Sequence, residues 1–149
     1  MKVEKDFEDL LKLFNKHKVR YCIVGAYAVA FYKRPRYTKD LDILVEPTPE
    51  NAKRIVQALK AFGFGSLKLK EEDFIKKGNI IQLGYEPVRV DLLTSIKGGP
   101  FKKIWETKRT GTYGQSRVFF IGKQALMRNK RLTGRQQDLA DIEVLSKKP

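Results

Sequence analysis

The chain has 149 residues, of which 42% are hydrophobic and 32% charged, so we expect one folded domain and exclude disorder. Lys and Arg number 31 against 17 Asp and Glu, and the net charge of +14 predicts an anionic partner, although a solubilising lysine surface would give the same excess. A single cysteine excludes an internal disulfide, and no apolar run approaches the ~18–20 residues of a membrane span. We therefore expect a cytoplasmic protein with no membrane partner.

The first half of the chain predicts alternating helices and strands. Apolar residues from Phe7 to Phe14 recur at helical spacing, which predicts an amphipathic first helix. Residues 19–25 are typical of a short buried strand with Cys22 in its core, and 26–31 of a helix packed closely on a sheet. A second strand is expected over 40–45. Thr48-Pro49-Glu50 then predicts the start of a helix, which Gly63 ends.

The second half predicts a small sheet followed by helices. Residues 79–84 and 88–93 are strand-like and flank Glu86-Pro87, so we expect a hairpin there. The remaining expected elements are a short helix at 101–108, a strand at 117–121, and helices at 122–131 and 135–146. The order predicts one mixed α/β (α+β) domain over 1–149, with a core at 1–121 and a helical C-terminal segment at 122–149.

Two aspartates stand at the start of a strand in the stretch RYTKDLDILV. Side chains two residues apart on a strand share a face, so Asp40 and Asp42 project together, ~6–7 Å apart. Two carboxylates so placed repel each other unless a cation lies between them, and Mg²⁺ is usually held by such oxygens together with substrate phosphates. The alternative is a solvated strand start, paired with the nearby cations Lys33, Arg34, Arg36 and Lys39.

A third aspartate favours the metal interpretation. Asp91 lies inside the apolar stretch VRVDLLTS, where Arg89 and Asp91 share one strand face. If strands 40–45 and 88–93 are neighbours, three carboxylates converge. Such a cluster suits phosphoryl or nucleotidyl transfer, in which two metal ions can clamp the attacking and leaving oxygens. Asp91 would be a metal ligand and would also accept the proton of the acceptor hydroxyl. Upstream, Gly25 lies between a strand and a helix, where backbone amides can approach phosphate closely.

Taken together, VGAYAVA, TKDLDILV and RVDLL resemble the nucleotidyltransferase fold shared with DNA polymerase β, a small mixed sheet flanked by helices. The tail LMRNKRLTGRQQDLADIEVL resembles the closing segment of AbiEii-like, toxin-type nucleotidyltransferases. The resemblance implies that Gly25 and Ala26 cradle the triphosphate and that Asp40, Asp42 and Asp91 hold Mg²⁺ or Mn²⁺. It also implies that Thr38 touches the nucleotide or the metal shell. Lys130 would contact phosphate, and Asp138 or Asp141 would position that lysine. The family usually has Gly or Ser where this chain has Ala26, whose side chain cannot contact phosphate.

These observations predict a metal-dependent enzyme that transfers a nucleoside monophosphate from a nucleoside triphosphate to an acceptor and releases pyrophosphate. The basic charge favours RNA, with a tRNA end as the family-style acceptor and Lys33, Arg34, Arg36 and Lys39 as its contacts. Two alternatives stay open: a small-molecule acceptor such as an aminoglycoside, and a non-catalytic nucleic-acid-binding module of the same fold. A partner protein or a second copy of the chain would supply further acceptor surface.

Overall fold

The computed structural model describes residues 3–33, 40–64, 68–85 and 88–147. Within them, six strands form one mixed sheet in the order β3-β4-β2-β1-β6-β5. The strands are β1 (Tyr21–Val24), β2 (Asp40–Val45), β3 (Ile80–Tyr85), β4 (Val88–Leu93), β5 (Arg109–Tyr113) and β6 (Ser116–Phe120). The helices are α1 (Lys5–Lys16), α2 (Gly25–Tyr32), α3 (Pro49–Phe62), α4 (Phe101–Glu106), α5 (Lys123–Thr133) and α6 (Gln136–Ser146), with a short 3-10 helix η2 (Glu71–Phe74).

Strand direction alternates across the centre of the sheet. β2 is antiparallel to β1 but parallel to β4, and β1 is parallel to β6, while β3–β4 and β5–β6 are antiparallel pairs. The expected hairpin over 79–93 is confirmed by the β3–β4 pair, although its connection at 86–87 lies outside the described residues. The expectation that strands 40–45 and 88–93 are neighbours is also confirmed.

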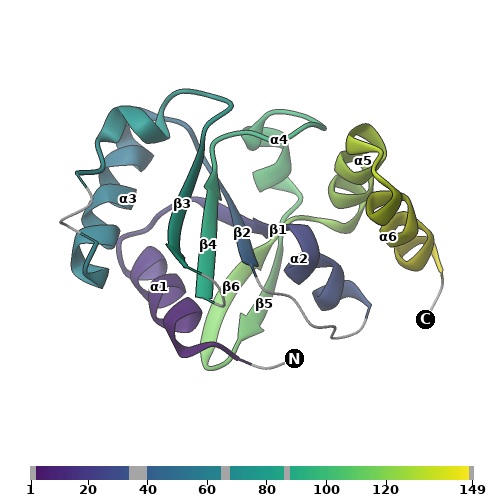
Figure 1. Ribbon diagram of the computed structural model, residues 1–149, viewed down its shortest axis with the longest axis horizontal. Helices are drawn as coiled ribbons and strands as arrows, with labels where there is room; N and C mark the ends of the chain where they lie inside the picture. The colour runs from purple at the N-terminus through teal and green to yellow at the C-terminus, as the bar shows by residue number, and fades with distance from the viewer. Residues whose placement is uncertain (1–2, 34–39, 65–67, 86–87, 148–149) are drawn as a thin grey trace.

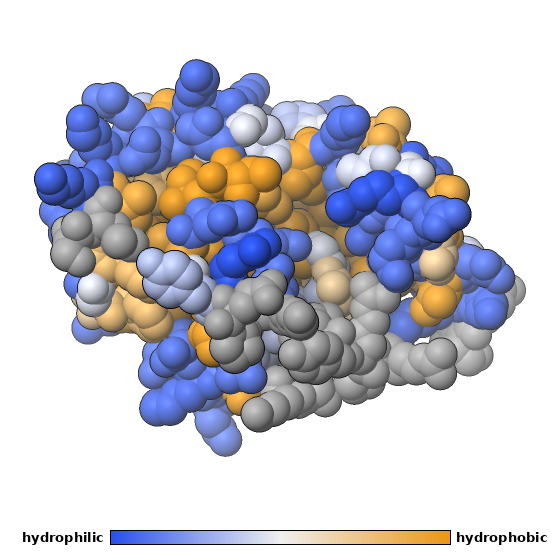
Figure 2. Space-filling view, viewed as in Figure 1, coloured by the Kyte–Doolittle hydropathy of each residue, from blue (hydrophilic) through white to orange (hydrophobic). Residues whose placement is uncertain are grey.

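Helices cover both sides of the sheet. α1 and α3 pack against each other on one side, and α2 packs on β1 and β2 from the other side, where α5 and α6 also lie (Figure 1). The core consists of apolar side chains of the strands, among them fully buried Cys22, and of apolar side chains from each of the helices α1 to α6, with α1, α2 and α3 contributing most. Hydrophilic residues cover much of the visible surface over α3 and over the α5–α6 pair, with apolar residues showing between them (Figure 2).

The ends of α3 follow the sequence signals. The Thr48 side chain accepts a hydrogen bond from the Asn51 amide, Pro49 is the first helical residue, and Gly63 ends the helix with a positive φ of 114°. The helix is therefore capped at both ends: a side-chain oxygen accepts from an otherwise unpaired amide at the start, and a residue in the left-handed conformation ends the helix.

One strand was not predicted. β5 (RTGTY) has a glycine at its centre and mostly exposed side chains, so its sequence has little of the apolar alternation that indicates a strand. The glycine is needed because a Cβ at Gly111 would lie 2.7 Å from the ring of Phe31. Close packing of an aromatic ring against the backbone therefore overrides strand propensity at this edge.

Asn51 connects the first turn of α3 to the two central strands. It is buried, accepts a hydrogen bond from the Arg20 amide at 2.8 Å, and donates to the carbonyls of Arg20 at 3.1 Å and Glu46 at 3.0 Å. Arg20 precedes β1 and Glu46 follows β2, so one side chain fixes the ends of both strands.

We predict that Asn51→Ala destabilises the protein by about 2–3 kcal/mol, because it leaves several buried backbone groups without partners. Chemical denaturation followed by circular dichroism measures this free energy. Lys53→Ala, an exposed position on the same helix, is the matched control and should change stability by less than about 0.5 kcal/mol. Equal effects of the two substitutions would contradict the role given to Asn51.

Candidate active site

Three carboxylates and a guanidinium occupy one face of the central sheet. In the parallel β2–β4 pair, Asp42 is directly opposite Asp91, and Asp40 is directly opposite Arg89. Directly opposed residues point to the same face, as do residues two apart on one strand, so the four side chains form the corners of a rectangle. Alternate residues Leu41 and Ile43 point to the other face and are fully buried in the core.

Arg89 bridges two of the carboxylates. Its Nη2 atom lies 2.9 Å from Asp40 Oδ2 and 3.2 Å from Asp91 Oδ2. The sequence pattern predicts that Arg89 shares a strand face with Asp91, but we predicted no function for Arg89 from it. The signal that was available is the R-x-D spacing itself, since a cation two residues from a carboxylate on a strand lies beside it.

Two carboxylate oxygens remain without a hydrogen bond. Asp40 Oδ1 and Asp91 Oδ1 are buried and have no partner within the described residues. Buried acceptors of this kind carry a desolvation cost that a bound cation or donor would remove. Among the same residues, no three His, Cys, Asp or Glu side chains are arranged around one point as metal ligands. The donor chemistry and the two orphaned oxygens nevertheless fit a hard divalent cation, which would compete with Arg89 for Asp40 and Asp91.

The carboxyl group of Asp42 has a raised pKa. Burial, with the neighbouring Asp91 and Asp40, raises the pKa of Asp42 from 3.8 to about 6, and the cations Arg89 and Lys130 only partly oppose this. A carboxyl that holds its proton so readily next to two other carboxylates is typical of a functional site.

Gly25 lies against Asp42. Its neighbour Val24 pairs with Asp42 across β1 and β2, and a Cβ at Gly25 would lie only 2.5 Å from Asp42 Oδ2. Gly25 also has a φ of +67°, at the first residue of α2. Only glycine meets both requirements, and it places the first amides of α2 beside the carboxylates. Ala26 is the next residue of that helix.

Lys130 approaches the same group from α5. It is buried, its Nζ lies 3.2 Å from Asp138 Oδ1 and 3.1 Å from Asp141 Oδ2, and it is close enough to lower the pKa of Asp42. Asp138 also accepts hydrogen bonds from Thr133 and Arg135. Burial tends to raise the pKa of Asp138, but the hydrogen bonds from Arg135, Thr133 and Lys130 outweigh it and hold that pKa below its usual value.

The basic residues expected to bind nucleic acid are only partly described. Lys33 ends α2 and donates a hydrogen bond to the carbonyl of Lys147. Arg34, Arg36, Thr38 and Lys39 lie outside the described residues. Neither their nucleic-acid contacts nor the nucleotide contact of Thr38 is tested, and these roles stay predictions.

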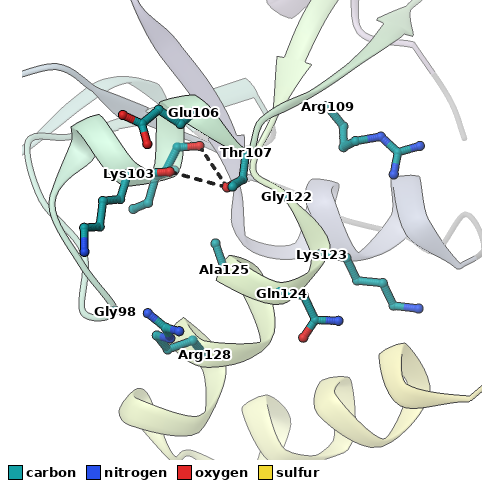
Figure 3. A pocket seen from close by; sticks show the side chains of 11 residues that line it. Gly98, Lys103, Glu106, Thr107, Arg109, Gly122, Lys123, Gln124, Ala125 and Arg128 are labelled. Carbon is teal, nitrogen blue, oxygen red and sulfur yellow. Dashed lines mark hydrogen bonds between the residues drawn. The ribbon is translucent and has the colours of Figure 1, made fainter.

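A cavity of about 580 Å³ lies beside α5 but does not contain the carboxylates. Its charged side chains come from α4, β5 and α5 and are Lys103, Glu106, Arg109, Lys123 and Arg128 (Figure 3). Arg128 and Lys130 are two positions apart on a helix and therefore do not face the same way. α5 thus presents cations both to this cavity and to the carboxylates.

The comparisons with known proteins concern the fold. No protein-family model matches the chain, and no curated protein matches it by sequence. It is similar to the structure of the lincosamide antibiotic adenylyltransferase LnuA bound to lincomycin, with a TM-score of 0.54, 17% identity and 95% of each chain covered. It is also similar to an antigenic nucleotidyltransferase-like protein from Paracoccidioides brasiliensis, with a TM-score of 0.57 and 13% identity over 96% of this chain and 76% of that one.

The chain has a nucleotidyltransferase fold. This confirms the fold predicted from the three short motifs, while the AbiEii-like, toxin-type subgroup is not supported by either similarity. In addition, no helix in the described part of the chain is long and apolar enough to cross a membrane.

The raised pKa of Asp42 has a consequence for stability. Because ionisation of Asp42 is harder in the folded state, its contribution to stability is full below the unfolded pKa near 3.8 and is lost as pH rises through about 6. In metal-free protein at pH 8, we predict that Asp42→Asn raises the free energy of unfolding by at most about 3 kcal/mol, and that this gain vanishes near pH 4.

Urea denaturation in the presence of a chelator at pH 4, 6 and 8 measures the difference. Asp6→Asn, which removes an exposed carboxylate on α1, is the control for the change in net charge. A gain for Asp42→Asn that is the same at all three pH values would contradict the role of burial and of the neighbouring carboxylates.

Proposed function

We propose that the protein is a metal-dependent nucleotidyltransferase, which transfers a nucleoside monophosphate from a nucleoside triphosphate to an acceptor hydroxyl and releases pyrophosphate. The observation that carries this proposal is the in-register pairing of Asp42 with Asp91, with Asp40 on the same face and the Gly25 backbone against Asp42. The nucleotidyltransferase fold supports it. A structural ion-pair network would not require a glycine at +67° that exposes helix amides to the same carboxylates.

Asp40, Asp42 and Asp91 would hold Mg²⁺ or Mn²⁺. When bound, the metal supplies positive charge for the phosphate oxygens and lowers the barrier to displacement of pyrophosphate. For this, Arg89 has to release Asp40 and Asp91, and Asp42 has to be ionised. Metal affinity should therefore increase as pH rises through about 6.

The remaining groups bind the triphosphate and accept a proton. The amides of Gly25 and Ala26 at the start of α2 would receive phosphate oxygens through the backbone, so the missing side-chain hydroxyl at Ala26 is not required. Lys130, held by Asp138 and Asp141, would contact the phosphates. Asp91 Oδ1 has no hydrogen-bond partner among the described residues, so it is available to accept the proton of the acceptor hydroxyl.

RNA is the proposed acceptor. The net charge of +14 and the four cations lining the cavity beside α5 favour an anionic acceptor over a cationic drug. One observation favours a small molecule instead: LnuA, whose name describes it as a lincosamide adenylyltransferase, matches this chain over 95% of both lengths. An RNA acceptor and a small-molecule acceptor make opposite predictions for one assay.

That assay incubates the full chain with each radiolabelled nucleoside triphosphate in turn, Mg²⁺ or Mn²⁺, and either total cellular RNA or lincomycin. Label that appears in RNA supports the proposed acceptor, whereas label only in the antibiotic replaces it with a small molecule. The label is on the α-phosphate, which stays with the transferred nucleoside monophosphate. Absence of label from both acceptors would contradict nucleotidyl transfer to them.

We predict that Asp42→Asn lowers the transfer rate at least ~10²-fold, because it removes negative charge where the metal is held. Circular dichroism should show an intact fold, since asparagine has nearly the same shape. Asp6→Asn on α1 is the matched carboxylate control and should retain activity. Activity of Asp42→Asn at the wild-type level would rule out the assignment of the three aspartates.

If RNA is the acceptor, its binding should weaken steeply with salt, because each phosphate contact releases a condensed counterion. Filter binding of a labelled tRNA between 50 and 200 mM KCl measures the slope of log affinity against log salt. Contact with about five phosphates would lower the affinity several hundredfold over this range. An affinity that does not change with salt would count against RNA.

A further inference from the structure

A second cavity, of about 550 Å³, lies at the opposite end of β1 from the carboxylates. Arg20, which lines it, immediately precedes β1, whereas Val24 at the other end of that strand pairs with Asp42. The two ends of a four-residue strand are about 10 Å apart. The lining residues, which we call the Trp105 pocket, are Asn15, Lys18, Val19, Arg20, Arg54, Trp105, Arg117 and Phe119.

Two aromatic rings, each packed against a further aromatic residue, form one wall of the Trp105 pocket. Trp105 and Phe119 are half-buried and meet edge to face, with ring centroids 5.4 Å apart and an interplanar angle of 70°. Phe101 lies behind Trp105 in a stacked arrangement at 5.8 Å, and Tyr21 lies behind Phe119 at 5.6 Å. The rings are therefore held in place by the core. Lys108 Nζ lies 3.8 Å from the ring centroid of Trp105 and 5.5 Å from that of Phe119, so a cation covers part of the ring surface, and a ligand in the cavity would meet the part that lines it.

The rest of the lining is strongly cationic. Four of the eight lining residues are Lys or Arg, and none of the eight is acidic. Arg20 lies over Trp105, with its Cζ 5.7 Å from the ring centroid, and its side chain is 51% exposed. Arg20 and Arg54 are partly neutralised by Glu46 at 3.5 Å and Glu50 at 3.1 Å. Lys18 and Arg117 have no acidic partner within the described residues, so the pocket keeps a net positive charge.

A ring surface beside several cations is the combination that binds nucleotides of a single strand. Bases stack on aromatic side chains whatever their identity, and Arg and Lys neutralise the phosphates that follow the bases. The cations of the Trp105 pocket come from the segment before β1, from α3 and from β6. They therefore reach the cavity from three separate segments of the fold, an arrangement that suits a chain of phosphates better than the single phosphate of a mononucleotide.

We infer that the Trp105 pocket binds single-stranded nucleic acid, with a base against Trp105 and Phe119 and phosphates toward Lys18, Arg20, Arg54 and Arg117. The Trp105 pocket is separate from the carboxylates, and the inference does not depend on whether the carboxylates take part in nucleotidyl transfer. A strand bound there extends along the protein surface, which suits a polymeric acceptor better than a small one.

Trp105 is the only tryptophan of the chain, so its fluorescence reports on this pocket alone. The experiment titrates the full-length protein with oligouridylate and oligoadenylate octamers at 50 mM KCl, and measures both tryptophan emission and the anisotropy of a labelled octamer. We expect stacking to quench the emission, with the same midpoint as the anisotropy change. Binding seen by anisotropy without any change in emission would place the strand elsewhere and overturn the inference.

Arg117→Gln tests the phosphate contacts without touching the core, because this side chain is exposed. It should weaken octamer binding at least fivefold and reduce the salt slope by about 1. Lys53→Gln, on the exposed face of α3 outside the pocket, is the control for net charge and should change binding less than twofold. Equal losses for the two variants would indicate a diffuse surface effect and contradict the inference.

Two further measurements test whether the ligand is a strand or a free nucleotide, and whether it binds in the Trp105 pocket or at the carboxylates. The tryptophan emission should respond to uridine monophosphate and to ATP at concentrations at least tenfold higher than to the octamers. A mononucleotide that quenches the emission as readily as an octamer would replace the strand with a free nucleotide. The Asp42→Asn variant should bind the octamers with unchanged affinity. A large change in the affinity of that variant, in either direction, would show that the strand occupies the carboxylate site instead.

Discussion

Strand pairing forces three carboxylates onto one face of the sheet, and the arrangement of the groups around them follows from the repulsion between these carboxylates. Asp42 and Asp91 cannot separate, because the β2–β4 register and the buried leucines and isoleucine on the opposite face fix both backbones. The surrounding groups offset this repulsion: Arg89 bridges two of the acids, and Lys130 approaches from α5. The pKa of the third acid, Asp42, is raised to about 6, so all three acids are largely ionised together only above that pH. Such an arrangement of acids favours added positive charge, which the metal ion of the proposed function would supply.

The C-terminal helices form part of this arrangement. Lys130 is buried and would be costly there on its own, but Asp138 and Asp141 both contact it. Buried ion pairs contribute little net stability compared with apolar packing, because desolvation offsets their attraction, so their main effect is to fix position. The pair of helices therefore holds one ammonium group at a defined place beside the sheet. In that sense α5 and α6 belong to the site, although they lie outside the α/β core in sequence.

Much of the site was predictable because its local signals are strong. The DLDILV alternation predicts β2 with its observed bounds, and Thr48-Pro49 predicts the start of α3. Pairing of β2 with β4 was a condition of the hypothesis, since no local signal states which strands are neighbours. The role of Arg89 and the strand β5 were missed for different reasons. Arg89 acts through a residue on the adjacent strand, and β5 depends on the ring of Phe31 packing over Gly111. The R-x-D spacing could have placed Arg89 beside Asp91, but its contact with Asp40 and the formation of β5 are tertiary effects that leave no pattern in the sequence.

The parallel pairing of β2 with β4 also has a kinetic consequence. Parallel neighbours cannot be joined by a tight turn, so α3, η2 and β3 all have to be traversed before Asp91 reaches Asp42, and Lys130 and its two acids come later still. Contacts between segments distant in sequence form slowly, because the loop between them has to close first. During synthesis, the acidic face of β2 therefore emerges well before the residues that balance it. The nascent chain cannot hold Lys130 between Asp138 and Asp141 until α6 has been made, so the carboxylates of β2 and β4 pair before this ammonium group is fixed beside them.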